Sequence, residues 1–138
     1  YPLDCCFSMF KQLFAQGQEF SYGLKETASY YNSYVNLMDH WDKVLPGKIL
    51  RVNNEDVIED LEGQVNRLLN FLDLPFEEGC ISFHETDRLV RTASSEQVRQ
   101  PINKKGMGRW KPYAKNLKPL IETLDNKLLI QEDISLIN

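Results

Sequence analysis

The sequence predicts a mostly α-helical chain that contains one short β-strand. Apolar residues recur every three or four positions through residues 24–45 and again through residues 60–74, which is the spacing of amphipathic helices. Between these stretches lies one β-type run, residues 48–52, with the sequence Lys-Ile-Leu-Arg-Val. With 138 residues, of which 42% are hydrophobic, the chain can form one domain with a core but is too short for two ordinary ones.

The first predicted element is a helix over residues 4–15, in which phenylalanines follow one another at spacings of three and four. Asp4 is a suitable N-cap for this helix. Ser8 then falls in the first turn or two, where helix amides favour an anion, although an ordinary surface hydroxyl fits the same position. Residues 17–23 connect this helix to the next one.

The long helix is predicted over residues 24–45, and Pro46-Gly47 ends it. Its aromatic residues would suit a platform for stacking bases, but at helical spacing they are more typical of core and groove lining. The apolar face consists of Leu24, Ala28, Tyr31, Val35, Met38, Trp41 and Leu45.

The β-type run at residues 48–52 stands alone in the sequence. A single strand leaves its backbone N–H and C=O groups without partners, and this sequence provides no obvious neighbouring strand. We therefore expect self-association through an exposed strand edge and apolar surface.

A further helix is predicted over residues 60–74, with Asp60 as its N-cap, and residues 76–83 predict a short helix. His84 and Glu85 follow. An imidazole and a carboxylate can take a proton from an acceptor hydroxyl, but a loop histidine is more often structural or solvated. The catalytic residues are therefore left unassigned.

The C-terminal part is predicted to be helical over residues 110–124, with Pro119 in a first helical turn. Residues 126–138 have no clear pattern and are predicted to be a tail. Because residue 1 is not methionine, we expect the sequence to begin inside a larger protein.

Composition favours a cytoplasmic protein that binds no membrane. No apolar run approaches membrane-spanning length, and the first residues lack the features of a secretory signal. The adjacent Cys5 and Cys6 are poorly placed to bond each other, which leaves Cys80 without a partner and favours a reducing compartment. No Cys/His cluster has metal-ligand spacing, so we expect no metal.

Residues 88–111 form a basic loop of charge +6 within a chain of net charge −4. Hydroxyl and amide side chains in this loop can donate hydrogen bonds, while Gly106 and Gly108 allow the backbone to approach a ligand. These cations and hydrogen-bond donors suit the binding of phosphate or sulfate, although a solvated surface loop has a similar composition. The loop contains seven bases, Arg88, Arg91, Arg99, Lys104, Lys105, Arg109 and Lys111, against the single acid Glu96.

This loop contains the strings Thr92-Ala93-Ser94-Ser95-x-Gln97-Val98-Arg99-x-Pro101-Ile102 and Gly108-Arg109-Trp110, with Tyr113 following. Together these strings resemble the nucleotide-binding segment of sulfotransferases. The likeness is closest to bacterial sulfotransferases that often carry tetratricopeptide repeats and are related to tyrosylprotein sulfotransferases. Supporting strings occur in compatible order: Pro2-Leu3-Asp4-x-x-x-Ser8, Phe20-Ser21-Tyr22, Tyr30-Tyr31, Leu37-Met38-x-His40-Trp41 and Leu45-Pro46-Gly47.

The resemblance implies that residues 1–125 are the C-terminal portion of a sulfotransferase domain with an α/β, P-loop-like fold, followed by the tail at 126–138. The family's loop for the 5′-phosphosulfate has no match here, so we expect the isolated chain to be inactive. The full enzyme would transfer a sulfuryl group from 3′-phosphoadenylyl sulfate to a hydroxyl or amine and release adenosine 3′,5′-bisphosphate. The acceptor is not indicated by the sequence.

The same resemblance assigns this chain to the 3′-phosphoadenosine side of the site. Ser8 would donate to the 3′-phosphate, although the arginine that the family places eight residues earlier would fall before Tyr1. At Asn54 many relatives have a tyrosine that helps to hold the nucleotide. Arg99 is chosen for its charge, as is Lys105. The full set of expected nucleotide-binding residues is Ser8, Asn54, Ser94, Ser95, Gln97, Val98, Arg99, Pro101, Asn103 and Arg109.

Two other classes of protein fit part of the sequence. A nucleic-acid or polyanion binder would use the basic loop, but the acidity of the whole chain argues against a broad electrostatic footprint. Such a protein would show a steep salt dependence and little preference for a 3′-phosphate. A helical protein-interaction module without catalysis would use the amphipathic helices and bind no nucleotide.

Overall fold

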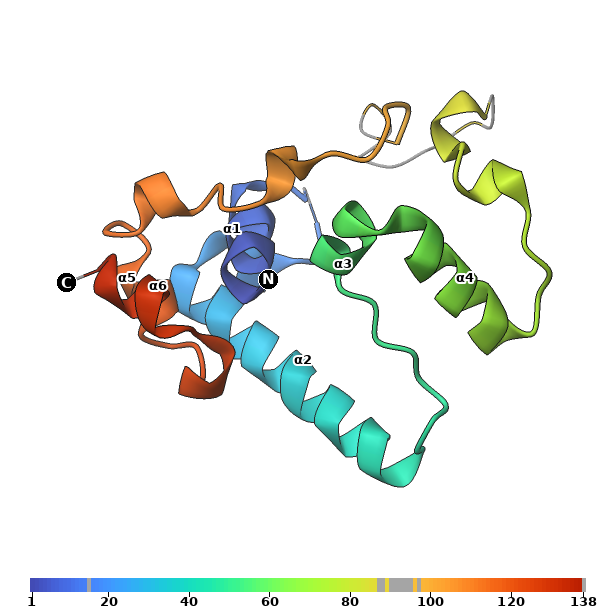
Figure 1. The fold of residues 1–138 in the computed structure, drawn as a ribbon. Helices are drawn as coiled ribbons and strands as arrows, with labels where there is room; N and C mark the ends of the chain where they lie inside the picture. Colours follow the sequence, from blue (N-terminus) through green and yellow to red (C-terminus); the bar gives the residue numbers. More distant parts are fainter. Residues whose placement is uncertain (15, 87–88, 90–95, 97, 138) are drawn as a thin grey trace. The chain divides into compact units, whose positions relative to one another are not determined.

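The computed structural model describes residues 1–137 except 15, 87–88, 90–95 and 97, and these form helices joined by turns and irregular segments (Figure 1). They divide into two compact units. One consists of Tyr1–Ile49 with Gly106–Asn138, and the other of Leu50–Lys105. The prediction of a mostly helical chain is confirmed, and the prediction of a strand is wrong.

The strand predicted at residues 48–52 is absent, and the described part of the chain contains no strand elsewhere. A strand is stable only when a neighbouring strand takes up its backbone hydrogen bonds. Here the carbonyl of Arg51 accepts a hydrogen bond from Nη2 of Arg67, at 2.5 Å, which is a side-chain contact rather than a ladder. The β-type run therefore remains irregular, and it provides no strand edge for self-association.

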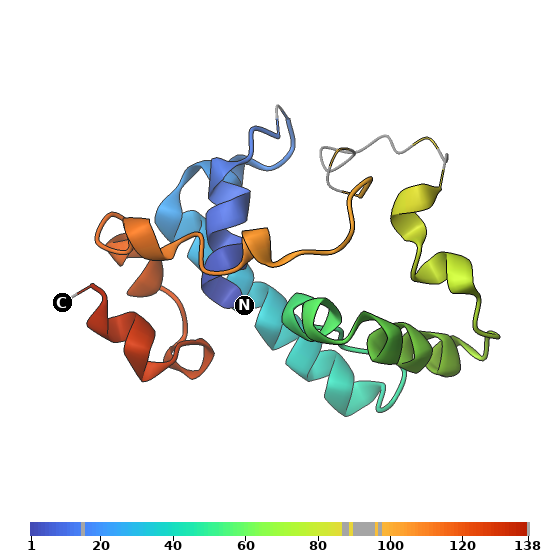
Figure 2. The same cartoon turned by 45° about the horizontal axis from the view of Figure 1, so that its top comes forward.

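The first unit is built on α1 (Pro2–Lys11), which begins two residues earlier and ends four residues earlier than predicted. Pro2 suits the first position of a helix because its missing N–H would have no partner there. The buried side of α1 meets α2 and the C-terminal segments (Figure 2). The shared core contains Leu3, Cys6, Phe7, Ala28, Trp110, Ala114, Leu117, Leu120, Ile121 and Leu124.

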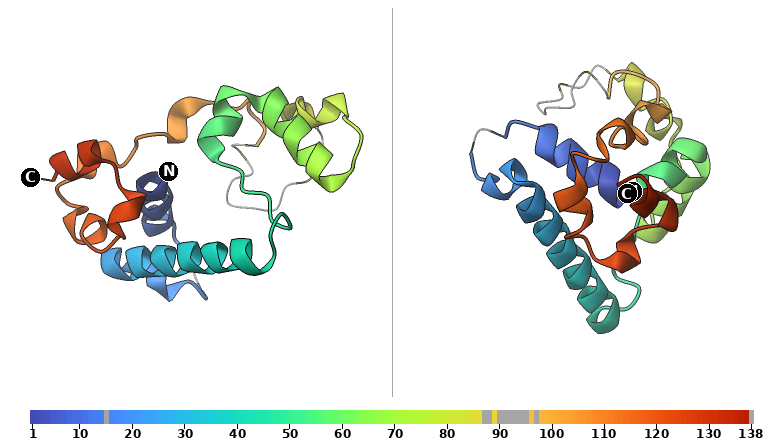
Figure 3. Two further views of the ribbon diagram at one scale, coloured as in Figure 1. Left: turned by 60° about the horizontal axis from the view of Figure 1, so that its bottom comes forward. Right: turned by 90° about the vertical axis from the view of Figure 1, so that its left-hand side faces the viewer.

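The long helix α2 (Leu24–Val44) confirms the predicted helix at residues 24–45. Its predicted apolar face is buried only in the first half. Ala28 lies in the core and Leu24 and Tyr31 pack against it, whereas Trp41 is 39% and Leu45 is 48% exposed. The C-terminal turns of α2 extend beyond α1 and the C-terminal elements of this unit (Figure 3).

The C-terminal segment packs onto the first unit through short elements. These are η5 (Lys111–Tyr113), α5 (Lys118–Ile121), η6 (Asn126–Leu128) and α6 (Gln131–Ser135). Pro119 lies in the first turn of α5, as predicted.

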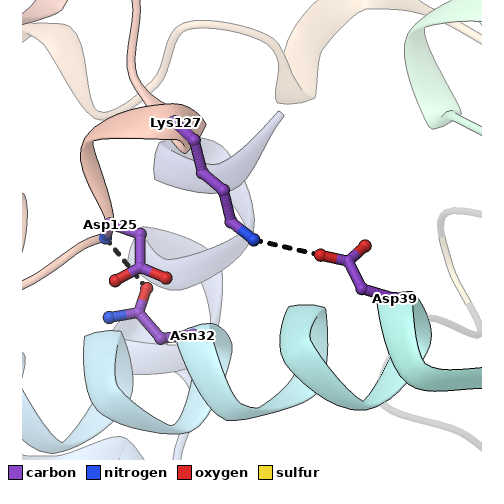
Figure 4. Close-up of polar contacts among 4 residues, drawn as sticks. All are labelled: Asn32, Asp39, Asp125 and Lys127. Carbon is purple, nitrogen blue, oxygen red and sulfur yellow. Dashed lines mark hydrogen bonds and ion pairs between the residues drawn. The ribbon is translucent and has the colours of Figure 1, made fainter.

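Hydrogen bonds of two polar side chains, Asp133 and Asn32, hold the segment after α5 in place, although the sequence there has no clear pattern. The Tyr1 hydroxyl donates to Oδ2 of the buried Asp133, which also accepts from the backbone N–H of Ile130 at 3.2 Å. Asn32 on α2 donates to the carbonyl of Thr123 at 2.9 Å and accepts from the N–H of Asp125 at 3.0 Å. Figure 4 shows the second Asn32 contact beside the ion pair of Lys127 with Asp39, at 3.0 Å.

The second unit contains α3 (Asn54–Glu59) and α4 (Leu61–Leu72), followed by single turns η2 (Glu78–Cys80), η3 (Phe83–Glu85) and η4 (Lys104–Gly106) at its boundary. The predicted cap of α4 is confirmed, because the Asp60 carboxylate accepts from the N–H of Gly63 at 2.9 Å. The short helix predicted at residues 76–83 is replaced by the two 3-10 turns η2 and η3.

Candidate functional site

Asp4 connects α1 to the C-terminal end of the basic loop. Its Oδ2 accepts from the N–H of Gly108 at 2.8 Å, and its Oδ1 accepts from the N–H of Arg109 at 3.0 Å. The predicted capping role of Asp4 is therefore wrong: the helix starts at Pro2, and the carboxylate binds amides more than one hundred residues away. We call Asp4, Gly108 and Arg109 the Asp4 junction.

The local sequence at the end of the loop explains this geometry. Gly108 has φ +69°, a left-handed conformation that glycine adopts without strain, and its carbonyl accepts from the N–H of Lys111 at 3.1 Å. The turn presents two successive N–H groups to the carboxylate. Trp110 follows and is completely buried, which fixes the turn to the core of the first unit.

Ser8 lies one helical turn after Asp4, and residues four apart share a face of a helix. The same side of α1 contacts the segment after the junction, because Phe7 stacks on Tyr113 with ring centroids 5.2 Å apart. Among the described residues, neither the Ser8 hydroxyl nor the Arg109 guanidinium has a hydrogen-bond or ion-pair partner, and both residues are exposed. Ser8 thus lies one helical turn from the carboxylate that accepts from the backbone N–H of Arg109.

The charges around the junction favour an anion. Lys11 lies over the ring of Phe7, with its Nζ 5.2 Å from the ring centroid, and the Lys111 side chain passes beside Gly108. With Arg109, these make three cations against the carboxylate of Asp4, whose oxygens already accept two amides. Sequence reasoning missed Asp4 and Lys11 as parts of this region. The i, i+4 spacing of Asp4 and Ser8 in one motif was the available signal.

The other expected nucleotide-binding residues belong to the second unit. Asn54 is the first residue of α3 and is exposed, while its neighbour Asn53 donates to the Asp56 carboxylate at 2.9 Å. Val98 is half-buried, and Arg99 and Pro101 are exposed. Ser94, Ser95 and Gln97 lie outside the described residues.

Asn103 uses its side chain within its own turn. Its Nδ2 donates to the carbonyl of Pro101 at 3.2 Å, and its Oδ1 accepts from the N–H of Lys105 at 3.1 Å. This is the Asx-type turn that asparagine commonly forms in loops. Asn103 therefore shapes the backbone next to the two lysines, and any contact with a ligand would have to compete with these bonds.

Cys6 and His84 are residue types that often act in catalysis, but the Cys6 thiol and Nδ1 of His84 are both buried here. Burial raises the pKa of the Cys6 thiol to about 12, and the neighbouring Cys5 adds to this effect, so Cys6 stays protonated. The ring of His84 meets Phe83 edge-on, and its buried Nδ1 has no hydrogen-bond partner within the described chain. Among the described residues, no group of three or more His, Cys, Asp and Glu side chains could hold a metal ion.

The sequence model of the sulfotransferase family matches residues 1–78, more than half of the chain. The chain belongs to the sulfotransferase family. The matched residues include the Pro-Leu-Asp-x-x-x-Ser string of α1, and therefore both Asp4 and Ser8. The tetratricopeptide-linked, bacterial type remains a prediction.

Two relatives are much longer than this chain. An uncharacterized protein of Aquifex aeolicus is 33% identical over 134 residues, which cover 95% of this chain but 18% of that protein. A putative protein-tyrosine sulfotransferase of Caenorhabditis briggsae is 31% identical over 70 residues, which cover 47% of this chain and 25% of that protein. No solved structure matches the chain. No helix among its described residues is long and apolar enough to cross a membrane.

Proposed function

We propose that this chain supplies the 3′-phosphoadenosine-binding side of a sulfotransferase that uses 3′-phosphoadenylyl sulfate. The observation that carries the proposal is the Asp4 junction. It joins two strings of the sulfotransferase resemblance that lie far apart in sequence, Pro2-Leu3-Asp4-x-x-x-Ser8 and Gly108-Arg109-Trp110.

The residues of the junction fit a phosphate by their chemistry. The Ser8 hydroxyl can donate a hydrogen bond, and the Arg109 guanidinium offers a planar fork of donors that matches two phosphate oxygens. Lys11 and Lys111 add positive charge. The resemblance also assigns residues 94–103, which belong to the second unit, to nucleotide binding, with Arg99 as a further cation.

In the whole enzyme, the bond between sulfur and the bridging phosphate oxygen would break as the acceptor oxygen or nitrogen bonds to sulfur. Cations that stabilise the leaving phosphate favour such a transfer. The chain spans only about a fifth to a quarter of the relatives that it matches. The acceptor site and the catalytic base are therefore proposed for the whole protein and are assigned to no residue of this chain.

Removing the Arg109 side chain is expected to weaken binding of adenosine 3′,5′-bisphosphate by about 10–100-fold, because a charge-assisted hydrogen bond contributes about 1.5–3 kcal/mol. Ser8→Ala is expected to weaken it by about 3–10-fold, the effect of one neutral donor. Isothermal titration calorimetry measures both affinities.

Matched controls are an exposed lysine and an exposed helix serine of the same unit, Lys115→Ala and Ser29→Ala, each expected to change the affinity by less than about twofold. Equal weakening by Arg109→Ala and Lys115→Ala would replace the proposed site with general attraction of a polyanion. A steep dependence on salt would accompany that result.

A further inference from the structure

The first turn of α1 is held by tertiary contacts and not by a local cap. Tyr1 stands at the N-cap position, and its side chain accepts no hydrogen bond from the amides of that turn. The acid of the first turn, Asp4, accepts instead from the N–H groups of Gly108 and Arg109. A helix start without a capping side chain frays unless other contacts hold it. The contacts of Tyr1 therefore affect where Asp4 lies.

The Tyr1 side chain is anchored by a buried carboxylate. Its ring packs against the core of the first unit, and its hydroxyl donates to Oδ2 of Asp133 in α6. The backbone carbonyl of Tyr1 accepts from the N–H of Cys5 at 3.0 Å, which is a hydrogen bond of the first helical turn. Tyr1 thus joins α6 to the beginning of α1, and Asp4 belongs to the same turn.

The burial of Asp133 is more than the capping of α6 requires. Asp133 is 2% exposed, whereas a carboxylate at a helix start can cap it from the surface. Burying a carboxylate costs free energy unless donors surround it. The N–H of Ile130 supplies one hydrogen bond, at 3.2 Å, and the Tyr1 hydroxyl supplies another. The buried position of Asp133 is therefore explained by its contact with α1.

We propose that Asp133 is a positioning residue for the Asp4 junction. Through Tyr1 it fixes the first turn of α1, and with that turn the Asp4 carboxylate that holds the end of the basic loop. Docking of α6 and closure of the junction are then coupled, and each stabilises the other. Leu3 is completely buried and also holds the turn, so loss of the contact should loosen the junction without unfolding α1. The consequence for nucleotide affinity rests on the proposed function.

Tyr1→Phe tests the coupling because it removes only the hydroxyl. In the 138-residue chain it is expected to speed trypsin cleavage after Arg109 by about 3–10-fold, the factor for one lost hydrogen bond. Arg109 precedes the completely buried Trp110, so cleavage there requires release of the turn. Calorimetric titration should show binding of adenosine 3′,5′-bisphosphate weakened by a similar factor.

Asn32→Ala is the matched control. It removes hydrogen bonds that connect the same C-terminal segment to α2 and not to α1. It is expected to lower the free energy of unfolding at least as much as Tyr1→Phe, yet to change cleavage after Arg109 and nucleotide affinity by less than about twofold. In an Asp133→Ala background, Tyr1→Phe should have no further effect on either readout, because the acceptor of the hydroxyl is already gone.

Faster cleavage and weaker binding in Tyr1→Phe but not in Asn32→Ala would support the positioning role. Equal changes in the two variants would overturn it, because the C-terminal segment would then act through general stability alone. Unchanged cleavage in Tyr1→Phe would overturn it as well. If the wild type binds no bisphosphate, the proposed function fails, while the cleavage rates still decide whether Asp133 and the junction are coupled.

Discussion

Trp110→Ala is expected to lower the free energy of unfolding by about 3–5 kcal/mol, the largest effect of any single change considered for this chain. Trp110 is completely buried and belongs to the core shared by α1, α2 and the C-terminal segment. Its removal leaves a cavity that this small core can close only in part. Urea denaturation followed by circular dichroism measures the loss.

Two variants test this explanation. Trp41→Ala removes the same side chain from a position that is 39% exposed, and it should cost less than about 1.5 kcal/mol. Trp110→Phe keeps most of the volume and removes an indole N–H that has no acceptor among the described residues, so it should cost less than Trp110→Ala by at least about 1.5 kcal/mol. Equal losses from Trp110→Ala and Trp41→Ala would show that the core has been placed wrongly.

Asp4→Ala is expected to cost about 2–4 kcal/mol of unfolding free energy and to abolish measurable binding of adenosine 3′,5′-bisphosphate. The substitution leaves the N–H groups of Gly108 and Arg109 without their acceptor, and each hydrogen bond to a carboxylate contributes about 1.5–3 kcal/mol, less where solvent can replace it. The turn that carries Arg109 then loses its attachment to α1. Urea denaturation and calorimetric titration measure the two effects.

Asp4→Asn separates the effect of the hydrogen bonds to Gly108 and Arg109 from the effect of the negative charge. The amide keeps one acceptor oxygen, so about half of the stability loss is expected. Glu122→Ala, which removes an exposed acid paired with Lys118, should cost less than about 0.5 kcal/mol. Trypsin cleavage after Arg109 offers a local readout, because release of the turn should speed cleavage there in Asp4→Ala and not in Glu122→Ala. Unchanged cleavage and unchanged binding in Asp4→Ala would contradict the role given to the junction.

Elements decided by neighbouring residues were predicted well from the sequence. The periodic apolar pattern predicted α2 to within one residue at its C-terminal end, and Asp60 caps α4 as its position before an amphipathic run suggested. Pro119 likewise lies in the first turn of its helix. In each case the hydrogen bonds or the packing period involve residues a few positions apart.

Elements that depend on distant partners were not predicted. The run at residues 48–52 has β-type composition, but a strand needs a ladder, and composition carries no information about whether one exists. The local sequence suggests Asp4 as an N-cap, but its carboxylate oxygens accept hydrogen bonds from the backbone N–H groups of Gly108 and Arg109. Residues 126–137 likewise depend on distant partners, because Asp133 accepts from the Tyr1 hydroxyl and Lys127 pairs with Asp39.

In the candidate site, too, local motifs could be identified from the sequence, whereas contacts between distant residues could not. The motifs identified Ser8 and Arg109, and the structure adds the carboxylate that connects their segments. Asn103 was expected at the nucleotide because of its place in a motif, but its side chain closes a local turn. Motif position indicates which residues the family uses, whereas the hydrogen bonds indicate what each side chain does in this fold.

The most direct test of the proposed half-site is calorimetric titration of the wild-type chain with adenosine 3′,5′-bisphosphate, compared with adenosine 5′-monophosphate under the same conditions. The two ligands differ only in the 3′-phosphate, the group assigned to Ser8 and Arg109. We expect saturable binding to one site that is at least about tenfold tighter for the bisphosphate. Equal affinities, or no saturable binding of the bisphosphate, would contradict it.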